Sequence, residues 1–263
     1  MLISLSIFLV TGAVAGLLAG LLGIGGGMVI VPALVFTLPA LGVAPEVLTQ
    51  VAVGTSLACI SAISISSARA HHVRGGVIWR VFAAMAPGLA VGALAGAALA
   101  HVMPSLWLQR VVGVAALLVA VKLLADIAPA PHRDLPGRPA LTAAGGIIGT
   151  LSSLIGIGGG SLTVPYLVWC NVAITRAVGT SAACGMPIAW AGAVGFAVAG
   201  WGLAGTGPGS LGYLNLPATG GIVAGSLVFT PLGAALAHRL PARALKRVFA
   251  LLLVVVGVRM LWG

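Results

Sequence analysis

A glycine-rich sequence of five residues occurs twice in this chain of 263 residues. Gly-Ile-Gly-Gly-Gly spans residues 23–27 and again residues 156–160, and each copy interrupts a long apolar run. A helix that breaks inside hydrocarbon leaves backbone N–H and C=O groups without partners, at several kcal/mol each. Breaks at matching positions of two similar halves are a sequence pointer to the binding site of a membrane transporter.

The composition supports a membrane protein. Hydrophobic residues make up 60% of the chain and charged residues only 6%, whereas a soluble domain carries about 25% charged residues. Residues 3–22, 47–68 and 81–100 contain no charge, and a helix needs roughly 20 apolar residues to cross a bilayer. The net charge of +10 comes from basic residues in short loops, which orient spans in the lipid bilayer, so we predict no nucleic-acid partner.

Three blocks recur in the same order, which indicates a duplication. Residues 23–32 match residues 156–165 at seven of ten positions, and residues 53–59 match residues 178–184 at six of seven. A weaker block runs from His101 to Arg110 and from His238 to Arg247.

We therefore predict an all-α polytopic membrane protein of two inverted repeats, each with about five hydrophobic segments and a glycine-broken helical hairpin. The first repeat covers residues 1–126, a cytoplasmic linker covers 127–140, and the second repeat covers 141–263. The second segment of each half has only about 14 residues, or ~21 Å of helix, so this hairpin is predicted to stop inside the bilayer. The predicted segments are 2–22, 28–42, 47–69, 77–100, 106–126, 141–155, 161–173, 175–200, 217–237 and 243–262.

The basic residues predict the orientation. An odd number of crossings per half gathers 11 of them on one side and leaves only Arg110 and Arg259 on the other. Because the basic side faces the cytoplasm, both termini and the uncharged loop 201–216 are predicted to lie outside, in a bacterial inner membrane. The 11 residues are Arg69, Arg74, Arg80, Lys122, Arg133, Arg138, Arg176, Arg239, Arg243, Lys246 and Arg247.

The glycine breaks are the first candidates for a site. New helices are expected to start at Met28 and at Ser161, and their first N–H groups have no partner within the helix. These donors and the helix dipole favour an anion. Pro32 and Pro165 would kink these helices or keep them short. The alternative is that each break is only a tight turn between closely packed helices.

Small hydroxyl residues form the second candidate set. They would donate hydrogen bonds to an oxyanion that faces the glycine breaks, or they would pack helices closely; the sequence leaves both interpretations open. Gln50 and Thr175 occupy matched positions nearby, and Arg176 is the basic residue adjacent to the second block. The two blocks are Gly54-Thr55-Ser56 and Gly179-Thr180-Ser181.

The sequence lacks the residues that several kinds of chemistry require. Glu46, Asp126 and Asp134 are the only acidic residues, and all lie in loops or at segment ends, which argues against proton or sodium coupling through carboxylates in the membrane. The sequence has no metal-ligand spacing, no nucleophile and base arrangement and no ATP-binding loop. We predict no catalytic residues, no metal and no cofactor.

The duplicated blocks resemble the TauE/SafE family of sulfite and sulfonate exporters. His72-Val-Arg74-Gly-Gly-Val-Ile-Trp79-Arg80 and Gly212-Tyr-Leu-Asn215-Leu-Pro217-Ala also carry the resemblance, which covers nearly the whole chain. The family is one of small-anion permeases. The resemblance implies that the substrate path includes both three-residue hydroxyl blocks and the two glycine breaks with their prolines, namely Gly25, Gly26, Gly27, Pro32, Gly158, Gly159, Gly160 and Pro165.

The sequence thus predicts export of a small oxyanion, either sulfite or a short organosulfonate such as sulfoacetate, by alternating access. A carrier of small carboxylates such as acetate or pyruvate is the main alternative, and a membrane scaffold without transport is a third hypothesis. The sequence leaves open whether the protein forms a homo-oligomer.

Overall fold

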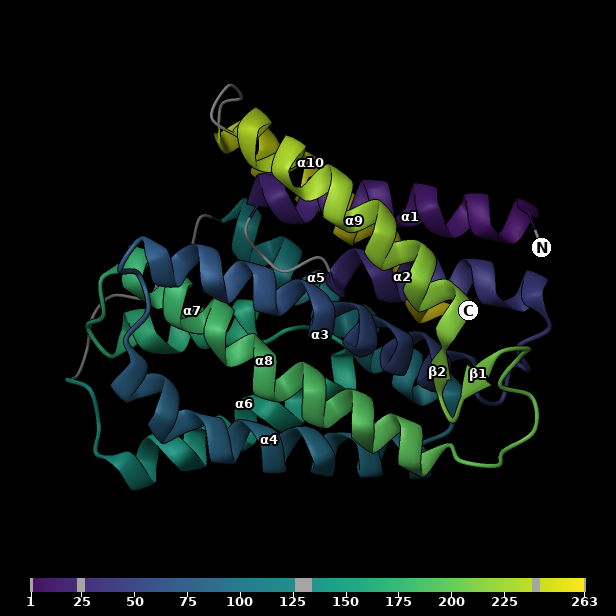
Figure 1. Ribbon diagram of the computed structural model, residues 1–263, viewed down its shortest axis with the longest axis horizontal. Coiled ribbons are helices and arrows are strands. Elements are labelled where there is room, and N and C mark those ends of the chain that lie inside the picture. The colour runs from purple at the N-terminus through teal and green to yellow at the C-terminus, as the bar shows by residue number, and fades with distance from the viewer. Residues whose placement is uncertain (1, 23–26, 126–133, 238–241, 263) are drawn as a thin grey trace.

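The computed structural model describes residues 2–22, 27–125, 134–237 and 242–262. In these residues the chain forms ten α-helices, a short 3₁₀ helix η1 and a hairpin of two-residue strands (Figure 1). All ten predicted segments correspond to helices, with bounds that differ by a few residues; α6 begins at Arg138, inside the predicted linker. The elements are α1 Leu2–Leu22, α2 Gly27–Thr37, η1 Leu38–Leu41, α3 Leu48–Val73, α4 Trp79–Val102, α5 Ser105–Leu124, α6 Arg138–Ile155, α7 Gly160–Trp169, α8 Ile174–Ala199, β1 Ser210–Leu211, β2 Leu214–Asn215, α9 Leu216–Ala237 and α10 Ala242–Trp262.

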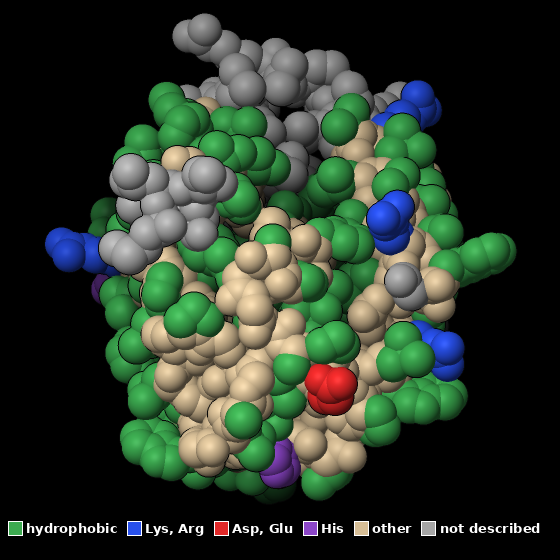
Figure 2. Space-filling model, turned by 90° about the vertical axis from the view of Figure 1, so that its right-hand side faces the viewer, with side chains coloured by type: hydrophobic (Ala, Val, Ile, Leu, Met, Phe, Trp, Pro, Cys, Tyr) green, Lys and Arg blue, Asp and Glu red, His purple; other side chains and the backbone are tan. Residues whose placement is uncertain are grey.

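The helices have the composition of membrane spans. Among the described residues, α3, α4, α5 and α8 are long and apolar enough to cross a membrane, and shorter apolar helices accompany them. Large apolar side chains such as Leu118, Val198 and Val255 point away from the protein, and Figure 2 shows hydrophobic side chains along its flanks with few charged ones. Such a surface suits lipid, which confirms the predicted helical membrane protein.

The antiparallel pair α3 and α8 lies at the centre of the bundle (Figure 1). The start of α3 meets the end of α8, because a Cβ added at Gly54 would lie 3.0 Å from Cβ of Phe196. We call this end, which also holds β1 and β2, the Tyr213 end. The opposite end, where α3 finishes and α8 begins, is the His71 end.

Glycines allow two pairs of parallel helices to pack closely around this centre. On α4, Gly88 and Gly92 face the backbone of Thr142 and Gly146 on α6 so closely that no Cβ would fit. On α1, a Cβ at Gly12 would likewise meet the backbone of Ile222 on α9. Close approach through small residues is the usual way in which membrane helices associate.

Two helical pairs enter the bundle from opposite ends. Helix α1 runs parallel to α9 from the Tyr213 end, and the segment after α2 returns to that end, where the Ala44 N–H donates to the Gly205 carbonyl at 2.8 Å. Helices α6 and α7 enter from the His71 end and return to it. Because α7 has ten residues, it extends only ~15 Å, about half of the hydrocarbon thickness.

Candidate functional site

The second glycine break lies inside the bundle between α6 and α7. Helix α6 ends in a Schellman motif, in which the N–H groups of Gly156 and Ile157 donate to Ser153 and Ser152 at 3.3 and 2.9 Å. Gly156 has φ +77° and Gly159 has φ +76°, a region that side-chain-bearing residues rarely adopt. These two glycines therefore allow the chain to leave one helix and to start the next within four residues.

A cavity of about 110 Å³ adjoins the start of α7. This volume suits one small solute, since a water molecule occupies about 30 Å³ in the liquid. The cavity extends along the inner faces of α3 and α8 toward the His71 end. The residues that line it are Ile60, Ile63, Ser64, Ser67 and His71 of α3, Gly158 of the break, Gly160 and Val164 of α7, Val178, Ser181, Ala182 and Gly185 of α8, and Thr230 of α9.

Hydrogen-bond donors without partners lie in and beside this cavity. The Ser181 hydroxyl lines it, is almost fully buried and has no hydrogen-bond partner within the described structure. The hydroxyl oxygens of Ser161 and Thr163, in the first turn of α7 beside the cavity, are also buried and have no hydrogen-bond partner within the described structure. No side chain of the described residues caps the start of α7. The N–H groups of Leu162 and Thr163 donate to the Gly159 carbonyl at 3.1 and 2.8 Å, which leaves those of Gly160 and Ser161 available. The arrangement offers neutral donors and a positive helix end to an anion.

Among the lining residues that the structure describes, His71 has the only ionisable side chain. It lies in the last turn of α3, at the His71 end. The start of α7, with Gly160 and Ser181, therefore has no charged side chain among the cavity-lining residues.

Gly27, the last residue of the first glycine-rich sequence, lies against the second glycine break at the centre of the bundle. A Cβ at Gly27, the first residue of α2, would lie 2.6 Å from the Gly156 carbonyl oxygen, and the Ser56 hydroxyl donates to that same oxygen at 2.9 Å. Gly27 and Gly156 are both buried. The predicted site residues Gly25 and Gly26 lie outside the described residues.

The threonines of the two hydroxyl blocks bind backbone groups. The Asn215 N–H donates to Thr55 Oγ1 at 2.9 Å, and the Ile78 N–H donates to Thr180 Oγ1 at 2.9 Å. These two segments, 72–80 and 212–218, also carry the family resemblance. Both threonines thus hold neighbouring segments of the protein in place, which agrees with the packing interpretation that the sequence left open.

The glycines of these blocks make matching contacts. A Cβ at Gly54 would lie 2.7 Å from the Tyr213 carbonyl oxygen, and one at Gly179 would meet the backbone of Gly76. Each hydroxyl block therefore holds a loop that comes from the other half of the sequence.

The remaining predicted site residues lie apart from the cavity. The Gln50 amide is buried and donates to the carbonyls of Ala100 and Met103 at 3.3 and 2.8 Å. Thr175 and Arg176 are exposed at the start of α8. Pro32 is buried within α2, and Pro165 lies half-buried within α7.

Sequence reasoning missed the α3 side of the cavity. Ser64, Ser67 and His71 follow each other at intervals of three and four residues, which places them on one face of a helix. That spacing could have identified the α3 side of the cavity from the sequence.

The sequence also suggests that Tyr213 belongs to an interfacial belt, because it lies at a segment end, and this is wrong. Tyr213 is buried, and its hydroxyl lies 3.0 Å from His101 Nδ1. Burial raises the pKa of its phenol above the usual 10.0. Through the contact with His101, Tyr213 ties the loop 201–216 to the end of α4.

Comparison with known proteins agrees with this architecture. Residues 8–260 match the family described as Sulfite exporter TauE/SafE. The chain belongs to the TauE/SafE family. It is a multi-pass membrane transporter that moves a small substrate, and the family is one of transporters rather than enzymes.

Several relatives cover most of this TauE/SafE protein. A probable membrane transporter protein of Haemophilus influenzae is 39% identical over 262 residues, which is 96% of each chain. One of Xylella fastidiosa is 28% identical and covers 98% of this chain and 95% of its own. The probable membrane transporter protein YunE of Bacillus subtilis is 32% identical over 63% of this chain and 67% of its own. No solved structure matches the chain.

The part of the chain that the structure describes contains no group of three or more His, Cys, Asp or Glu residues placed to hold a metal ion.

Proposed function

We propose that this TauE/SafE transporter carries a small oxyanion, either sulfite or a short organosulfonate such as sulfoacetate, and that the anion binds in the cavity at the start of α7. The observation that carries the proposal is the combination of an uncapped helix start with the unpartnered, buried Ser181 hydroxyl at one cavity. An unmade hydrogen bond of a buried polar group costs about 1–3 kcal/mol. An oxyanion with several acceptor oxygens would satisfy these donors together.

The absence of charge from the lining favours a weakly held substrate. A buried arginine would bind an oxyanion through two hydrogen bonds, but the described lining residues include none. Neutral donors and a helix dipole stabilise an anion by smaller amounts, about 0.3–1 kcal/mol for the dipole. Weak binding lets a transporter release its substrate on the other side of the membrane.

We propose further that residues 1–126 and 141–263 form two inverted repeats that expose the cavity alternately to the two sides of the membrane. Three observations support this organisation: α1–α2 and α6–α7 enter from opposite ends, Gly27 lies against Gly156 of the second break, and Thr55 and Thr180 hold matching loops. Inverted repeats that pack around a central site are the usual basis of alternating access.

The His71 end faces the cytoplasm in this proposal, and both termini face outward. Arg69 and Arg74 lie at the end of α3 and Arg176 at the start of α8, all at the His71 end. Cytoplasmic loops carry an excess of basic residues. The cavity then opens inward, which suits export from a bacterial inner membrane.

Flux into liposomes tests the substrate. Purified protein in sealed liposomes should pass sulfite or sulfoacetate faster than empty liposomes at equal gradients, and the rate should saturate with concentration. The Gly185→Leu protein provides a matched control, because this side chain would occupy the cavity. Equal flux through protein-containing and empty liposomes at all gradients contradicts the proposal.

Competition separates the two anion classes. Sulfonates and sulfite should inhibit labelled sulfite flux, whereas acetate and pyruvate should inhibit weakly. If acetate or pyruvate competes as well as unlabelled sulfite does, the protein is a small-carboxylate carrier instead.

A further inference from the structure

The two ends of the α3 and α8 pair differ in the structure although their sequences repeat. Positions in the two helices correspond at a constant interval, since Ser181 matches Ser56 and 181 − 56 = 125. With this interval, Ser64 matches Ala189, Ser67 matches Gly192 and His71 matches Phe196. The α3 lining of the cavity at the His71 end thus has a counterpart on α8 at the Tyr213 end.

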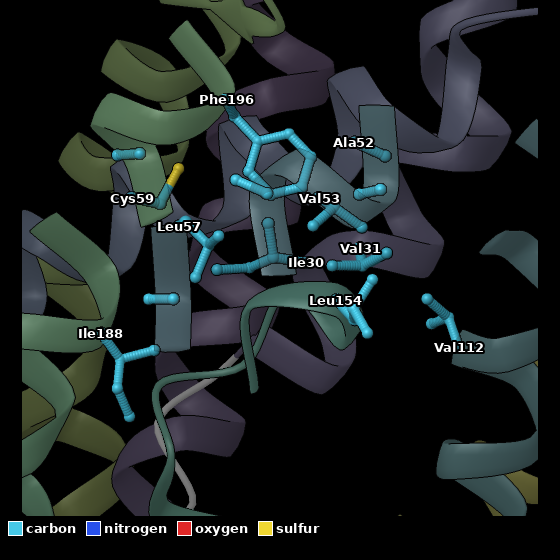
Figure 3. Close-up of a cluster of buried hydrophobic side chains, with 14 of the residues drawn as sticks. Ile30, Val31, Ala52, Val53, Leu57, Cys59, Val112, Leu154, Ile188 and Phe196 are labelled. Atoms are coloured by element: carbon cyan, nitrogen blue, oxygen red, sulfur yellow. The ribbon is translucent and has the colours of Figure 1, made fainter. Parts of the chain in front are cut away.

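The described counterparts on α3 and α8 at the Tyr213 end are buried. Val53, Leu57, Ala189 and Phe196 are fully buried, whereas their matches Val178, Ala182, Ser64 and His71 line the open cavity. Figure 3 shows Val53, Leu57 and Phe196 packed together with Val31 of α2. The bundle is therefore open on one side of its centre and sealed on the other.

Gly185 and Ile60 match one another under the same interval, since 185 − 60 = 125, and both line the open cavity. Matched residues can approach each other only near the axis of the pseudo-symmetry, and because these two residues line one cavity, they lie near that axis. The substrate position beside this pair can therefore be shared by an opening toward either end.

We infer that the sealed region opens into a second cavity that faces the Tyr213 end and takes the same small oxyanion. This inference rests on the proposed function. The second cavity is lined by Ser56, Leu57, Ala189, Gly192 and Phe196, and Ser56 takes the role that Ser181 has in the structure.

The hydrogen bonds of the two serines define the difference between the states. In the structure Ser56 donates to the Gly156 carbonyl at 2.9 Å, and Ser181 has no partner among the described residues. In the opposite-facing state, the Ser56 hydroxyl leaves Gly156 and donates to the anion. The contacts of Thr55 and Thr180 with their loops exist at both ends in the present state, so they do not distinguish open from sealed.

Phe196 and Leu57 form the gate of the second cavity. A Cβ at Gly192 would lie 2.8 Å from Leu57 Cδ1, and the Phe196 ring stands 6.2 Å from that of Tyr213 in an edge-on arrangement. The two matched positions at the open end carry the smaller Ala182 and the polar His71. The anion therefore passes a polar mouth on one side and an apolar gate on the other.

Cysteine labelling in vesicles tests this inference. The variants Ser56→Cys and Ala189→Cys report the sealed region, and their matched controls Ser181→Cys and Ser64→Cys report the open cavity. A charged maleimide that cannot cross the bilayer, and that forms a stable thioether, is applied to one side at a time, with sulfoacetate on both sides because sulfite itself consumes thiol reagents. The wild-type protein gives the background level of labelling, because its three cysteines are buried.

Ser181→Cys and Ser64→Cys should react from the side of the His71 end only. Ser56→Cys and Ala189→Cys should react from the opposite side only, and labelling should stop sulfite flux. Because the modification is irreversible, even a minor state accumulates label over time. Ser56→Cys is nearly isosteric, and Ala189→Cys provides an independent reading if one of the two folds poorly.

Two outcomes separate the second cavity from the substrate. The first outcome is saturable sulfite flux with no label at either sealed position, or with label only from the His71 side. This result overturns the second cavity but does not contradict sulfite as the substrate. Labelling of Ser56→Cys from the Tyr213 side in a protein without sulfite flux supports the cavity and overturns the substrate.

Discussion

The His71 end and the Tyr213 end of the α3 and α8 pair are built from repeated sequence, yet a cavity lies at the His71 end, whereas the matching residues that the structure describes at the Tyr213 end are buried. At the His71 end, Ala182 and Ser181 leave space beside the start of α7. At the Tyr213 end, Leu57 and Phe196 fill the matching space, and Ser56 is bonded to Gly156. The comparison teaches that duplication supplies two similar frameworks, and that side-chain volume and one hydrogen bond decide which is open.

Filling the cavity at the His71 end should cause the largest change in sulfite flux. Gly185→Leu places a side chain where a Cβ would already lie 2.8 Å from the Gly158 carbonyl oxygen. Overpacking costs about 1–3 kcal/mol, and 1.4 kcal/mol is a factor of ten. We expect sulfite flux to fall by about tenfold or more while the protein still inserts into the membrane. Gly220→Ala, at a position with open space around its Cβ, should transport normally.

Removing a side chain from the sealed end should make that end easier to open. Phe196→Ala removes a fully buried ring, and such changes cost about 3–5 kcal/mol of stability. The sealed state should lose more of this energy than a state with an open gate. We expect a lower melting temperature and faster labelling of Ala189→Cys from the Tyr213 side in the double variant.

Phe229→Ala, at an exposed site on α9, serves as the control for this change. An equal rise in labelling for Phe229→Ala and Phe196→Ala would show that the ring at Phe196 does not gate the sealed end.

The two threonines should sharpen the comparison further. Thr55→Val leaves the buried Asn215 N–H without its acceptor, and Thr180→Val does so for the half-buried Ile78 N–H. An unpaired buried donor costs about 1–3 kcal/mol, and partial access to solvent reduces this cost. Thr55→Val should therefore lower the thermal stability more than Thr180→Val. The reverse order would contradict the deeper burial of the Asn215 N–H.

The two serines should give the smallest but most specific difference. Ser181→Ala removes a hydroxyl that has no partner among the described residues, so stability should stay unchanged while the KM for sulfite rises. Ser56→Ala removes the bond to Gly156, worth about 0.5–1.5 kcal/mol, so stability should fall. Melting curves and saturation of flux in the same preparations compare the two, and a KM unchanged in Ser181→Ala would remove that hydroxyl from the site.

Much of the fold could be predicted from the sequence, because hydrophobic length and glycine breaks depend on local chemistry. Helix α8, Ile174–Ala199, is predicted as residues 175–200, because Arg176 lies at the start of an apolar run and Gly200 lies at its end. The linker was placed three residues too late at its end, because Pro139 can occupy the first turn of a helix as well as a loop.

The candidate site could be predicted only in part. The repeat predicts Gly158, Gly160 and Ser181 as site residues, and the structure places these three beside one cavity. Repetition alone could not tell Ser181 from Ser56, because their difference depends on the conformation that the bundle adopts. Gln50 was assigned to the substrate path as a donor, but its amide is bonded to the end of α4, a partner that only the packing of distant segments reveals.

A structure determined with selenite, a heavier analogue of sulfite, tests the location of the substrate most directly. An anomalous density peak is expected within hydrogen-bond distance of Ser181 Oγ and the backbone N–H groups at the start of α7. A peak only beside the exposed Arg176, or none in the bundle of a protein that transports selenite, would contradict a binding site at the glycine break.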